Sequence, residues 1–335
     1  MYIYIERELT MINIGIIHNP KAKKLVLDPY FAFVLEYTLG QFGISASPTG
    51  EDQLKSILRR FKQYNVPIIA FNGGDGTINF ILSALVCIYN EYPKKPLPKL
   101  LFLRSGTVNT IPRGCGVKGR PEYILYNAVR KLEEGKPLST VTRNTIQING
   151  RTGFLWGGGK VANFMRRYYS KDVVSPLHAA KTVIVSIFLA LFRPSKFSEE
   201  FKSLFAKVYI NDDKDPVYDG ELSIPFAATI RDVGLGFKPF FLADPEKKQF
   251  HFLSFKGFSI WHLIREIPFA LFGRPLDTER TLNFPAQKIR LVSPDPIHAT
   301  FDGDMFPKNE ADIKHDQDEY EVEIQLGPQV KIIVI

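Results

Sequence analysis

The segment 70–77 reads Ala-Phe-Asn-Gly-Gly-Asp-Gly-Thr, which brings glycines, a carboxylate and a hydroxyl close together. It follows the apolar, β-prone run 66–71, and apolar residues recur after it at helical spacing. This pattern predicts a strand, a tight turn and a helix that begins near Thr77. Gly73, Gly74 and Gly76 can adopt backbone angles closed to other residues and allow close approach to the main chain. Because the start of a helix attracts anions, the turn predicts a phosphate site.

Asp75 needs a separate explanation, because a carboxylate beside phosphates is repelled unless it binds a metal, accepts a proton or is itself paired. We interpret Asp75 as a residue that takes part in chemistry. The alternative is a tight strand-to-helix turn in which Asp75 caps the helix, and the glycines alone do not separate the two interpretations.

Two further loops follow predicted buried strands. The apolar run 99–103 leads into Ser-Gly-Thr-Val-Asn-Thr at 105–110, and the run 12–18 leads into Asn-Pro-Lys-Ala-Lys-Lys at 19–24. In an open α/β sheet, ligands bind at the carboxyl ends of the strands. We therefore expect the three loops to meet at one crevice and to offer donors or positive charge to one ligand.

The NP pair at 19–20, the GGDGT run at 73–77 and the SGTVN run at 105–109 have the order and spacing seen in the diacylglycerol kinase catalytic domain family. That family includes bacterial lipid kinases, sphingosine kinases and ceramide kinases, and the resemblance extends over nearly the whole chain. The Asp-Gly-Asp run at 302–304 resembles the family's C-terminal DGE element with Asp in place of Glu. The resemblance implies transfer of the γ-phosphate of ATP, with Mg²⁺, to a lipid hydroxyl of diacylglycerol or of a sphingoid lipid such as ceramide or sphingosine.

The resemblance also implies roles for individual residues. It assigns nucleotide and phosphate binding to Asn19, Lys23, Thr49, Gly73, Gly74, Asp75, Gly76, Thr77, Thr107 and Asn109. Asp75 would hold the metal and take part in catalysis. Asp302 and Asp304 would form the base region, where a carboxylate takes the proton of the lipid hydroxyl.

The chain departs from the family pattern at several positions. Lys21 follows the NP pair where a small residue is usual, Arg104 replaces a proline before the third loop, and Phe80 and Thr110 replace acidic residues. The loss of the acidic residue at Thr110 weakens the diacylglycerol assignment more than the kinase assignment. Lysines in the segment 242–250 argue against the structural Mg²⁺ that bacterial relatives hold there.

Chain length and a change of secondary-structure pattern along the chain predict two domains, since 335 residues exceed the usual limit of about 250–300 for one core. Residues 1–138 alternate strands and helices, which predicts an α/β domain with a parallel sheet and flanking helices. Residues 139–335 show short alternating strands, which predicts a mainly antiparallel β domain. The resemblance implies that the first is a nucleotide-binding domain similar to those of NAD kinases and diacylglycerol kinases, and that the second is a lipid-substrate domain. We expect the last strand to return to the first domain and the nucleotide cleft to lie between the domains.

The net charge of +8 is concentrated between residues 160 and 207. That window contains the apolar run 183–192, and a second apolar run with basic residues occupies 260–274. Both are shorter than the roughly 20 residues of a membrane-spanning helix. They suit interfacial helices on an anionic membrane surface, or alternatively core helices with basic ends. Because the substrate implied is a lipid, we expect peripheral contact with the membrane.

Other classes of protein fit less well. The sequence contains no recognition helix, zinc-ligand spacing or RNA-binding aromatic signature, so we expect no nucleic acid partner. Two cysteines are too few for a disulfide framework, so we expect a reducing compartment. Together with the lipid substrate that the resemblance implies, this favours a cytoplasmic enzyme at the inner face of the membrane. A homodimer is compatible with the sequence. Two alternative functions stay open: an NAD kinase-like kinase of a soluble metabolite, and a catalytically impaired lipid-binding protein.

Overall fold

The structure, a computed structural model of the chain, describes residues 12–169, 201–233, 237–257, 259–307, 315–316 and 319–335. The chain divides into two compact units. The first contains Met1–Gly106, Gly116–Val141 and Val330–Ile335, and the second contains Thr107–Cys115 and Thr142–Gln329. The predicted apolar run 183–192 lies outside the described residues.

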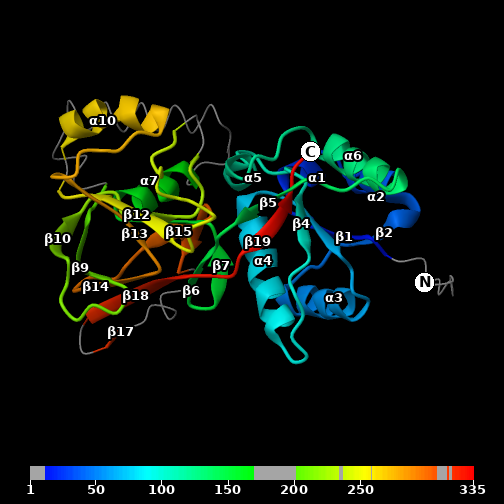
Figure 1. Cartoon of the computed structure of the whole chain (residues 1–335), viewed down its shortest axis with the longest axis horizontal. Coiled ribbons are helices and arrows are strands. Elements are labelled where there is room, and N and C mark those ends of the chain that lie inside the picture. The colour runs from blue at the N-terminus through cyan, green and yellow to red at the C-terminus, as the bar shows by residue number, and fades with distance from the viewer. Residues whose placement is uncertain (1–11, 170–200, 234–236, 258, 308–314, 317–318) are drawn as a thin grey trace. The chain divides into compact units, whose positions relative to one another are not determined.

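The first unit is an α/β unit built around one six-stranded sheet (Figure 1). Its strands are β1 (Ile14–His18), β2 (Gly43–Ala46), β3 (Ile68–Asn72), β4 (Lys99–Phe102), β5 (Thr140–Arg143), which runs on into the second unit, and β19 (Val330–Ile333). Its helices are α1 (Lys23–Leu27), α2 (Phe31–Leu39), the 3-10 turn η1 (Gly40–Phe42), α3 (Glu51–Gln63), α4 (Asp75–Asn90) and α6 (Pro121–Glu133).

The order of strands in this sheet is β2-β1-β3-β4-β19-β5. Strand β1 pairs in parallel with both β2 and β3, β3 with β4, and β4 with β19. From β1 the chain continues to β2 on one side and then crosses to β3 on the other, so the direction of winding changes between β1 and β3. In open α/β sheets this point of change opens a crevice at the carboxyl ends of the strands.

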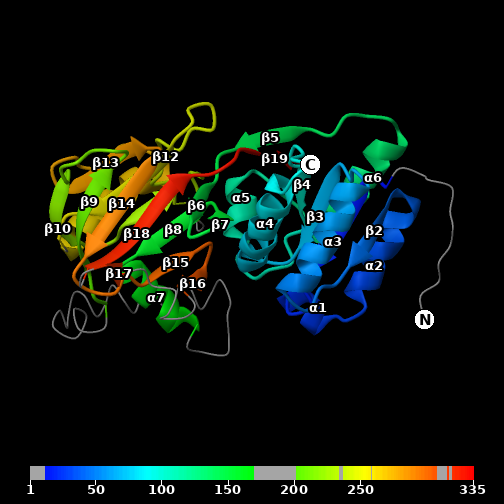
Figure 2. The same cartoon turned by 90° about the horizontal axis from the view of Figure 1, so that it is seen from below.

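Helices cover both faces of the first sheet. Helices α3 and α4 pack together on one face, and α2 and α6 pack together on the other (Figures 1 and 2). Helix α3 buries Leu54, Leu58 and Phe61, which recur at helical spacing, while most of its charged residues face solvent. Strands β1 and β3 are buried along their whole length, as expected for a parallel sheet covered on both sides.

Within the described residues, the second unit contains two antiparallel sheets and three helices. The first sheet contains β6 (Ile146–Ile148), β7 (Arg151–Gly153), β9 (Leu204–Ile210), β10 (Tyr218–Leu222), β14 (Lys288–Ser293), β17 (His315–Asp316) and β18 (Glu319–Leu326). The second contains β8 (Leu155–Gly158), β11 (Phe226–Ala228), β12 (Phe250–Phe255), β13 (Thr281–Ala286), β15 (Ala299–Phe301) and β16 (Asp304–Phe306). The helices are α5 (Thr110–Gly114), α7 (Lys160–Tyr169) and α10 (Ile260–Phe272).

One hydrophobic core joins these two sheets. Ile289 and Leu291 from the first sheet and Trp156, Phe252 and Phe301 from the second belong to the same buried cluster. Strand β9 of the first sheet alternates buried with exposed or half-buried residues, so this sheet turns one face to the core. Strand β12 of the second sheet is buried along almost its whole length. The unit is therefore a β-sandwich.

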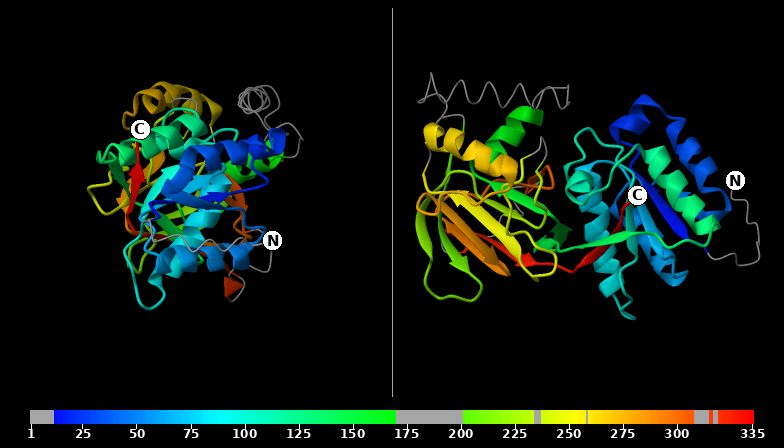
Figure 3. Two further views of the ribbon diagram at one scale, coloured as in Figure 1. Left: turned by 90° about the vertical axis from the view of Figure 1, so that its right-hand side faces the viewer. Right: turned by 45° about the horizontal axis from the view of Figure 1, so that its top comes forward.

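Helix α10 lies outside the sandwich (Figures 1 and 3). Its Ala270 packs against a smaller cluster that contains Ala228 of β11, Phe240 and Leu253 of β12. The helix ends at Gly273, whose φ of +63° is the left-handed conformation common after a helix C-terminus.

The loop at 244–249 is held by a side-chain amide. Asn144 donates from Nδ2 to the carbonyl oxygens of Asp244, Lys247 and Gln249 at 3.2, 3.2 and 3.1 Å. Its Oδ1 accepts a hydrogen bond of 2.8 Å from Gln329. These carbonyl groups thus converge on an amide donor in the segment where the resemblance places a structural metal in bacterial relatives.

The predicted fold class is confirmed in part, as an α/β protein with several sheets. The last strand, β19, lies in the sheet of the first unit. The segment Thr107–Cys115 groups with the second unit, although it lies far ahead of the predicted boundary at 138. The nucleotide cleft between the domains stays a prediction.

The burial of His251 on β12 makes the stability of the second unit depend on pH. Its Nε2 lies 2.5 Å from Oδ1 of Asn283, and its ring makes edge contacts with Phe240 and Phe241. Burial lowers the pKa of His251 from 6.5 to about 4, against the opposing effect of the bond to Asn283. The unfolded chain therefore binds more protons between these pH values, so stability falls as the pH falls from 6.5 and levels off below about 4.

We expect the free energy of unfolding to lose about 3 kcal/mol through His251 across this pH range. The difference between wild type and His251→Gln, measured by denaturant unfolding at successive pH values, isolates this contribution. The exposed His298 supplies the control, and His298→Gln should follow the wild type. Parallel pH curves for wild type and His251→Gln would contradict the assignment.

Candidate functional site

The loops that follow β1, β3 and β4 meet at the carboxyl ends of these strands. The backbone N–H of Ser105 donates to the carbonyl oxygen of Gly73 at 3.0 Å, and that of Asn19 donates to Asn72 at 3.0 Å. Asn19 also donates from Nδ2 to Oγ1 of Thr77 at 2.7 Å. The structure therefore brings together Asn19, Gly73, Gly74 and Thr77 of the predicted phosphate site within the first unit.

A buried side-chain network holds the three strand ends in register. His18 and Asn72 are opposite each other on β1 and β3, and Nδ2 of Asn72 donates to Nδ1 of His18 at 2.7 Å. Oδ1 of Asn72 accepts a hydrogen bond from the hydroxyl of Ser105. Burial lowers the pKa of His18 despite the charge of Glu36, which raises it. The neutral imidazole can accept from Asn72, whereas an imidazolium could not.

Nε2 of His18 is buried without a hydrogen-bond partner among the described residues. His18, buried and hydrogen-bonded to Asn72, is part of the scaffold beneath the loops. Sequence analysis did not identify the roles of Asn72 and Ser105, because a polar residue at the end of a strand gives no sign of its partner.

Close packing explains two of the glycines. A Cβ atom on Gly73 would lie 2.3 Å from Oγ1 of Thr77, and one on Gly74 would lie 3.1 Å from Cα of Gly106. Neither Gly73, Gly74 nor Gly76 has a positive φ. The expectation that these glycines serve unusual backbone angles was therefore wrong. Gly73 is required by the close packing of Thr77 in the same turn, and Gly74 by the close approach of the loop after β4.

Helix α4 begins directly after these glycines, with Gly74 as its N-cap and Asp75 as its first residue. The first helical hydrogen bond runs from the N–H of Ile78 to the carbonyl oxygen of Gly74 at 3.0 Å. The amides before Ile78 have no acceptor within the helix, and the helix dipole adds positive potential there. The donor set fits a phosphate group.

The site offers fewer protein groups for Mg²⁺ than for phosphate. Among the residues that the structure describes, no group of three or more His, Cys, Asp or Glu side chains could hold a metal ion. Protein-bound Mg²⁺ often uses one or two carboxylates together with phosphate oxygens and water. Asp75, half-buried at the start of α4, fits that mode as a single protein ligand beside bound phosphates.

Lys24, one of the lysines near the first loop, is paired with an acidic residue. Lys24 forms a 2.8 Å ion pair with Glu122 on α6, and its Nζ lies 3.7 Å from the ring centre of Phe31. Burial raises the pKa of Glu122, but the hydrogen bond from Lys24 outweighs it together with smaller contributions and leaves the pKa lowered. Lys21 and Lys23 are exposed at this loop.

The remaining predicted nucleotide-binding residues are placed differently. Thr49 is exposed before α3, where its backbone N–H and its hydroxyl donate to Oε1 of Gln53, both at 3.0 Å. A side chain in the first turn that accepts the backbone N–H of a residue just before the helix is typical of a helix N-terminus. Thr107 and Asn109 group with the second unit, and Asn109 has a φ of +55° as the N-cap of α5.

Arg104 shows a structural effect of one departure from the family pattern. Its φ is +36°, whereas proline is restricted to about −65°. The backbone before the third loop therefore takes a conformation that the family's proline does not allow. The Arg104 guanidinium donates to the carbonyl oxygen of Gly119 at 3.1 Å.

Asp302 and Gly303 form the turn of the β15–β16 hairpin in the second unit. Phe301 pairs with Asp304 across the turn, and Asp302 and Gly303 have φ values of +50° and +87°. Two-residue hairpin turns with positive φ at both positions favour Asp-Gly. This Asp-Gly pair beside apolar residues was a signal for a hairpin that our sequence analysis did not use.

The two carboxylates of this hairpin have different surroundings. Asp302 is 1% exposed, and its Oδ1 accepts the N–H groups of Phe154 and Leu155 at 3.0 and 2.8 Å. Its own N–H donates to Leu155 at 2.8 Å. Asp302 thus ties the hairpin to β8, while Asp304 is half-buried.

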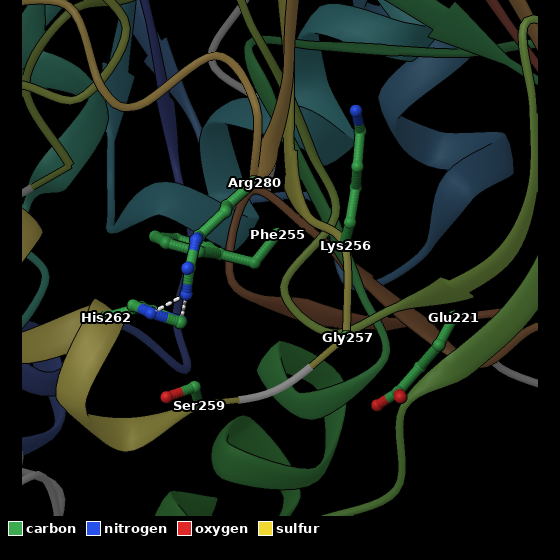
Figure 4. Close-up of a pocket in the computed structure, with 7 residues that line it drawn as sticks. All are labelled: Glu221, Phe255, Lys256, Gly257, Ser259, His262 and Arg280. Atoms are coloured by element: carbon green, nitrogen blue, oxygen red, sulfur yellow. Dashed lines mark hydrogen bonds between the residues drawn. The ribbon is translucent and has the colours of Figure 1, made fainter.

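The second unit also contains a cavity of about 410 Å³ (Figure 4). Its lining residues are Glu221, Phe255, Lys256, Gly257, Ser259, His262 and Arg280. None of the residues predicted for nucleotide binding or catalysis lines it, so the cavity does not contribute to the predicted site.

Comparison with known proteins agrees with this geometry. Residues 13–140 match the model of the diacylglycerol kinase catalytic domain family, which confirms the resemblance for that part of the chain. The matched residues include the first two loops and all of Ser105–Asn109. No curated protein matches the sequence at a significant level.

Solved structures share the fold at low sequence identity. A diacylglycerol kinase from Bacillus anthracis str. Sterne is 14% identical, with a TM-score of 0.59 and 98% of each chain covered. A candidate diacylglycerol kinase from the same strain is also 14% identical, with a TM-score of 0.64 and 99% of each chain covered. At this identity the likeness establishes the fold over the full length of the chain.

The close packing at Gly73 can be tested by adding one methyl group. Gly73→Ala places a Cβ against the buried Thr77, so we expect a loss of about 1–3 kcal/mol in the free energy of unfolding. Gly50→Ala is the matched control, because nothing lies within 4 Å of the added Cβ and its φ is −158°. Denaturant unfolding of both variants provides the measurement, and equal stability of the two would contradict the packing argument.

Proposed function

We propose that this protein is an ATP-dependent lipid kinase that transfers the γ-phosphate to a lipid hydroxyl. The observation that carries the proposal is the meeting of three loops at the β1–β3 switch point, where α4 begins; the first loop supplies the side-chain amide of Asn19, and the other two contain glycines. The family match over residues 13–140 supports a kinase of the diacylglycerol kinase family. Diacylglycerol and sphingoid lipids are the acceptors that the resemblance implies.

Phosphoryl transfer depends mainly on alignment and on stabilisation of negative charge. The amides at the start of α4 bind phosphate oxygens. The lack of a Cβ at Gly73 makes room for Thr77, and its lack at Gly74 lets the loop after β4 pack closely. Asn19 holds Thr77 in place through its side-chain amide. Asp75 holds Mg²⁺, which neutralises phosphate charge when it is bound.

Removal of the proton from the acceptor hydroxyl requires a carboxylate that the acceptor can reach. Asp302 and Asp304 form the base region of the proposal. Asp302 is buried, and its oxygens accept backbone N–H groups that anchor its hairpin. Because Asp304 is half-buried and thus more accessible, we assign proton transfer to Asp304 and the positioning of the hairpin to Asp302.

The function is tested by incubating the purified protein with labelled ATP, Mg²⁺ and, in parallel, diacylglycerol, ceramide, sphingosine and NAD. We expect label in a lipid and none in NAD. Asp75→Asn should lower turnover by about a hundredfold or more, because it weakens the metal site. The exposed Asp52 on α3 supplies the matched control, and Asp52→Asn should keep wild-type turnover. Labelled NAD would support the metabolite kinase instead, and lipid binding without any labelled product would support a binding protein.

The roles of Asp302 and Asp304 are distinguished by measuring both stability and turnover of the variants. Asp302→Ala leaves buried N–H groups of Phe154 and Leu155 without an acceptor, so we expect a loss of about 1–3 kcal/mol in the free energy of unfolding. Asp304→Asn should keep wild-type stability and lower turnover by about a hundredfold. Asp295→Asn, at an exposed carboxylate, is the control for both measurements. Full turnover in Asp304→Asn, together with loss of turnover in a folded Asp302→Asn variant, would exchange the two roles.

A further inference from the structure

Helix α10 turns an apolar stripe to solvent. Trp261, Phe269 and Phe272 are 68%, 42% and 77% exposed. Together with Arg265 and Pro268 they are spaced along the helix so that all five lie on one side. We call this set of five residues the α10 stripe. Large aromatic residues gathered on an exposed face mark a surface that contacts another apolar phase.

The opposite side of α10 is occupied by its own unit. Glu266 is buried, and its Oε2 accepts the backbone N–H of Asp277 at 3.2 Å. Its Oε1 accepts hydrogen bonds of 3.2 and 3.1 Å from Arg265. The helix is therefore anchored by a buried acid and by the packing of Ala270, which leaves the aromatic side chains of the stripe directed outward.

Basic residues surround the α10 stripe. Lys238 and Arg274 lie beside the C-terminal end of the helix, where their backbone N–H groups donate to Ala270 and Phe269 at 2.7 and 2.9 Å. Both are exposed. The stripe itself contains Arg265, whose guanidinium also pairs with Asp277.

Two further cations lie at the other end of α10, around the cavity of the second unit. Figure 4 shows Arg280 turned toward His262 on α10, while the side chain of Lys256 extends away from both. Arg280 donates from Nη1 to His262, and Nζ of Lys256 donates to the carbonyl oxygen of Glu279 at 3.2 Å. Of the acids in this region, Glu266 is buried and Asp277 is ion-paired, whereas Glu279 is exposed. Glu221, which lines the cavity, is half-buried and accepts a hydrogen bond from Ser203.

We infer that the α10 stripe is a docking surface for an anionic phospholipid bilayer. An interfacial helix inserts aromatic side chains at the headgroup level and keeps its basic groups at the phosphates, and the long Arg265 side chain can reach the phosphates from within the stripe. Charge complementarity selects this partner: an anionic surface neutralises the basic rim, whereas a second copy of the chain would bring two basic rims together. The inference is independent of the proposed kinase reaction, because binding is measured without ATP.

Vesicle sedimentation tests the docking surface. We expect the protein to bind vesicles of equal parts phosphatidylcholine and phosphatidylglycerol at least about tenfold more strongly than phosphatidylcholine alone, with weaker binding at high salt. The double variant Trp261→Ser/Phe272→Ser should lose at least about tenfold in the partition coefficient. The double variant Lys256→Gln/Arg280→Gln should lose about fivefold for each charge.

Matched variants in the first unit distinguish binding by the α10 stripe from nonspecific binding of vesicles. Phe33→Ser/Tyr37→Ser removes two exposed aromatic residues from α2, and Arg60→Gln removes an exposed charge from α3. Both should bind vesicles as the wild type does. Equal losses in the α2 and α10 aromatic variants, or no loss in either α10 variant, would overturn the inference.

Tryptophan fluorescence reports insertion directly, because Trp156 is fully buried and Trp261 is exposed, and the chain has no other tryptophan. Brominated acyl chains should quench Trp261 and shift its emission to shorter wavelength. Trp261→Phe should keep binding and lose this signal. A wild-type dimer that Trp261→Ser/Phe272→Ser converts to monomers, in sedimentation without vesicles, would show a protein interface instead and overturn the proposal.

Discussion

The contact between the β3–α4 loop and the loop after β4 is the constraint on which the candidate nucleotide site depends. Gly74 and Gly106 approach so closely that an added Cβ would lie 3.1 Å from the opposing backbone. The buried network of His18, Asn72 and Ser105 fixes the strand ends beneath this contact. The amides at the start of α4 are thereby aimed by a rigid sheet, and preorganised donors of this kind stabilise charge without reorganisation during the reaction.

The second unit shows how one motif can combine structural and chemical demands. The Asp-Gly of the run 302–304 satisfies the backbone angles of a tight hairpin, and the Asp302 carboxylate also satisfies two amides of another strand. A buried carboxylate with several donors is a strong anchor, because loss of the acceptor would leave each amide unsatisfied. The half-buried Asp304 on the same hairpin is held in position by that anchor.

Helix α10 reverses the usual distribution of residue types in a surface helix. Its buried side contains a charged residue that is fully hydrogen-bonded, and its exposed side contains Trp261 and Phe272. Burial of a carboxylate costs free energy unless donors compensate it, so this arrangement is specific. Among the described residues no helix is long and apolar enough to cross a membrane. An interfacial helix lies along the membrane surface instead of crossing the membrane, so only one side of α10 would meet lipid.

Local pattern was sufficient to predict the buried strands β1, β3 and β4, the glycine loop before α4, and the alternating strands of the second unit. These features depend on near neighbours in the chain, through backbone angles, periodicity and helix termini. The partners of His18, Asn19 and Asp302 lie 54, 58 and 147–148 residues away, so tertiary structure alone decided them. For the same reason sequence placed Asp302 and Asp304 together as a pair of acids, while the fold buried one against backbone amides and left the other half-exposed. Likewise, the glycines were predictable as a loop, but the physical reason for Gly74, the approach of a second loop from another strand, existed only in three dimensions.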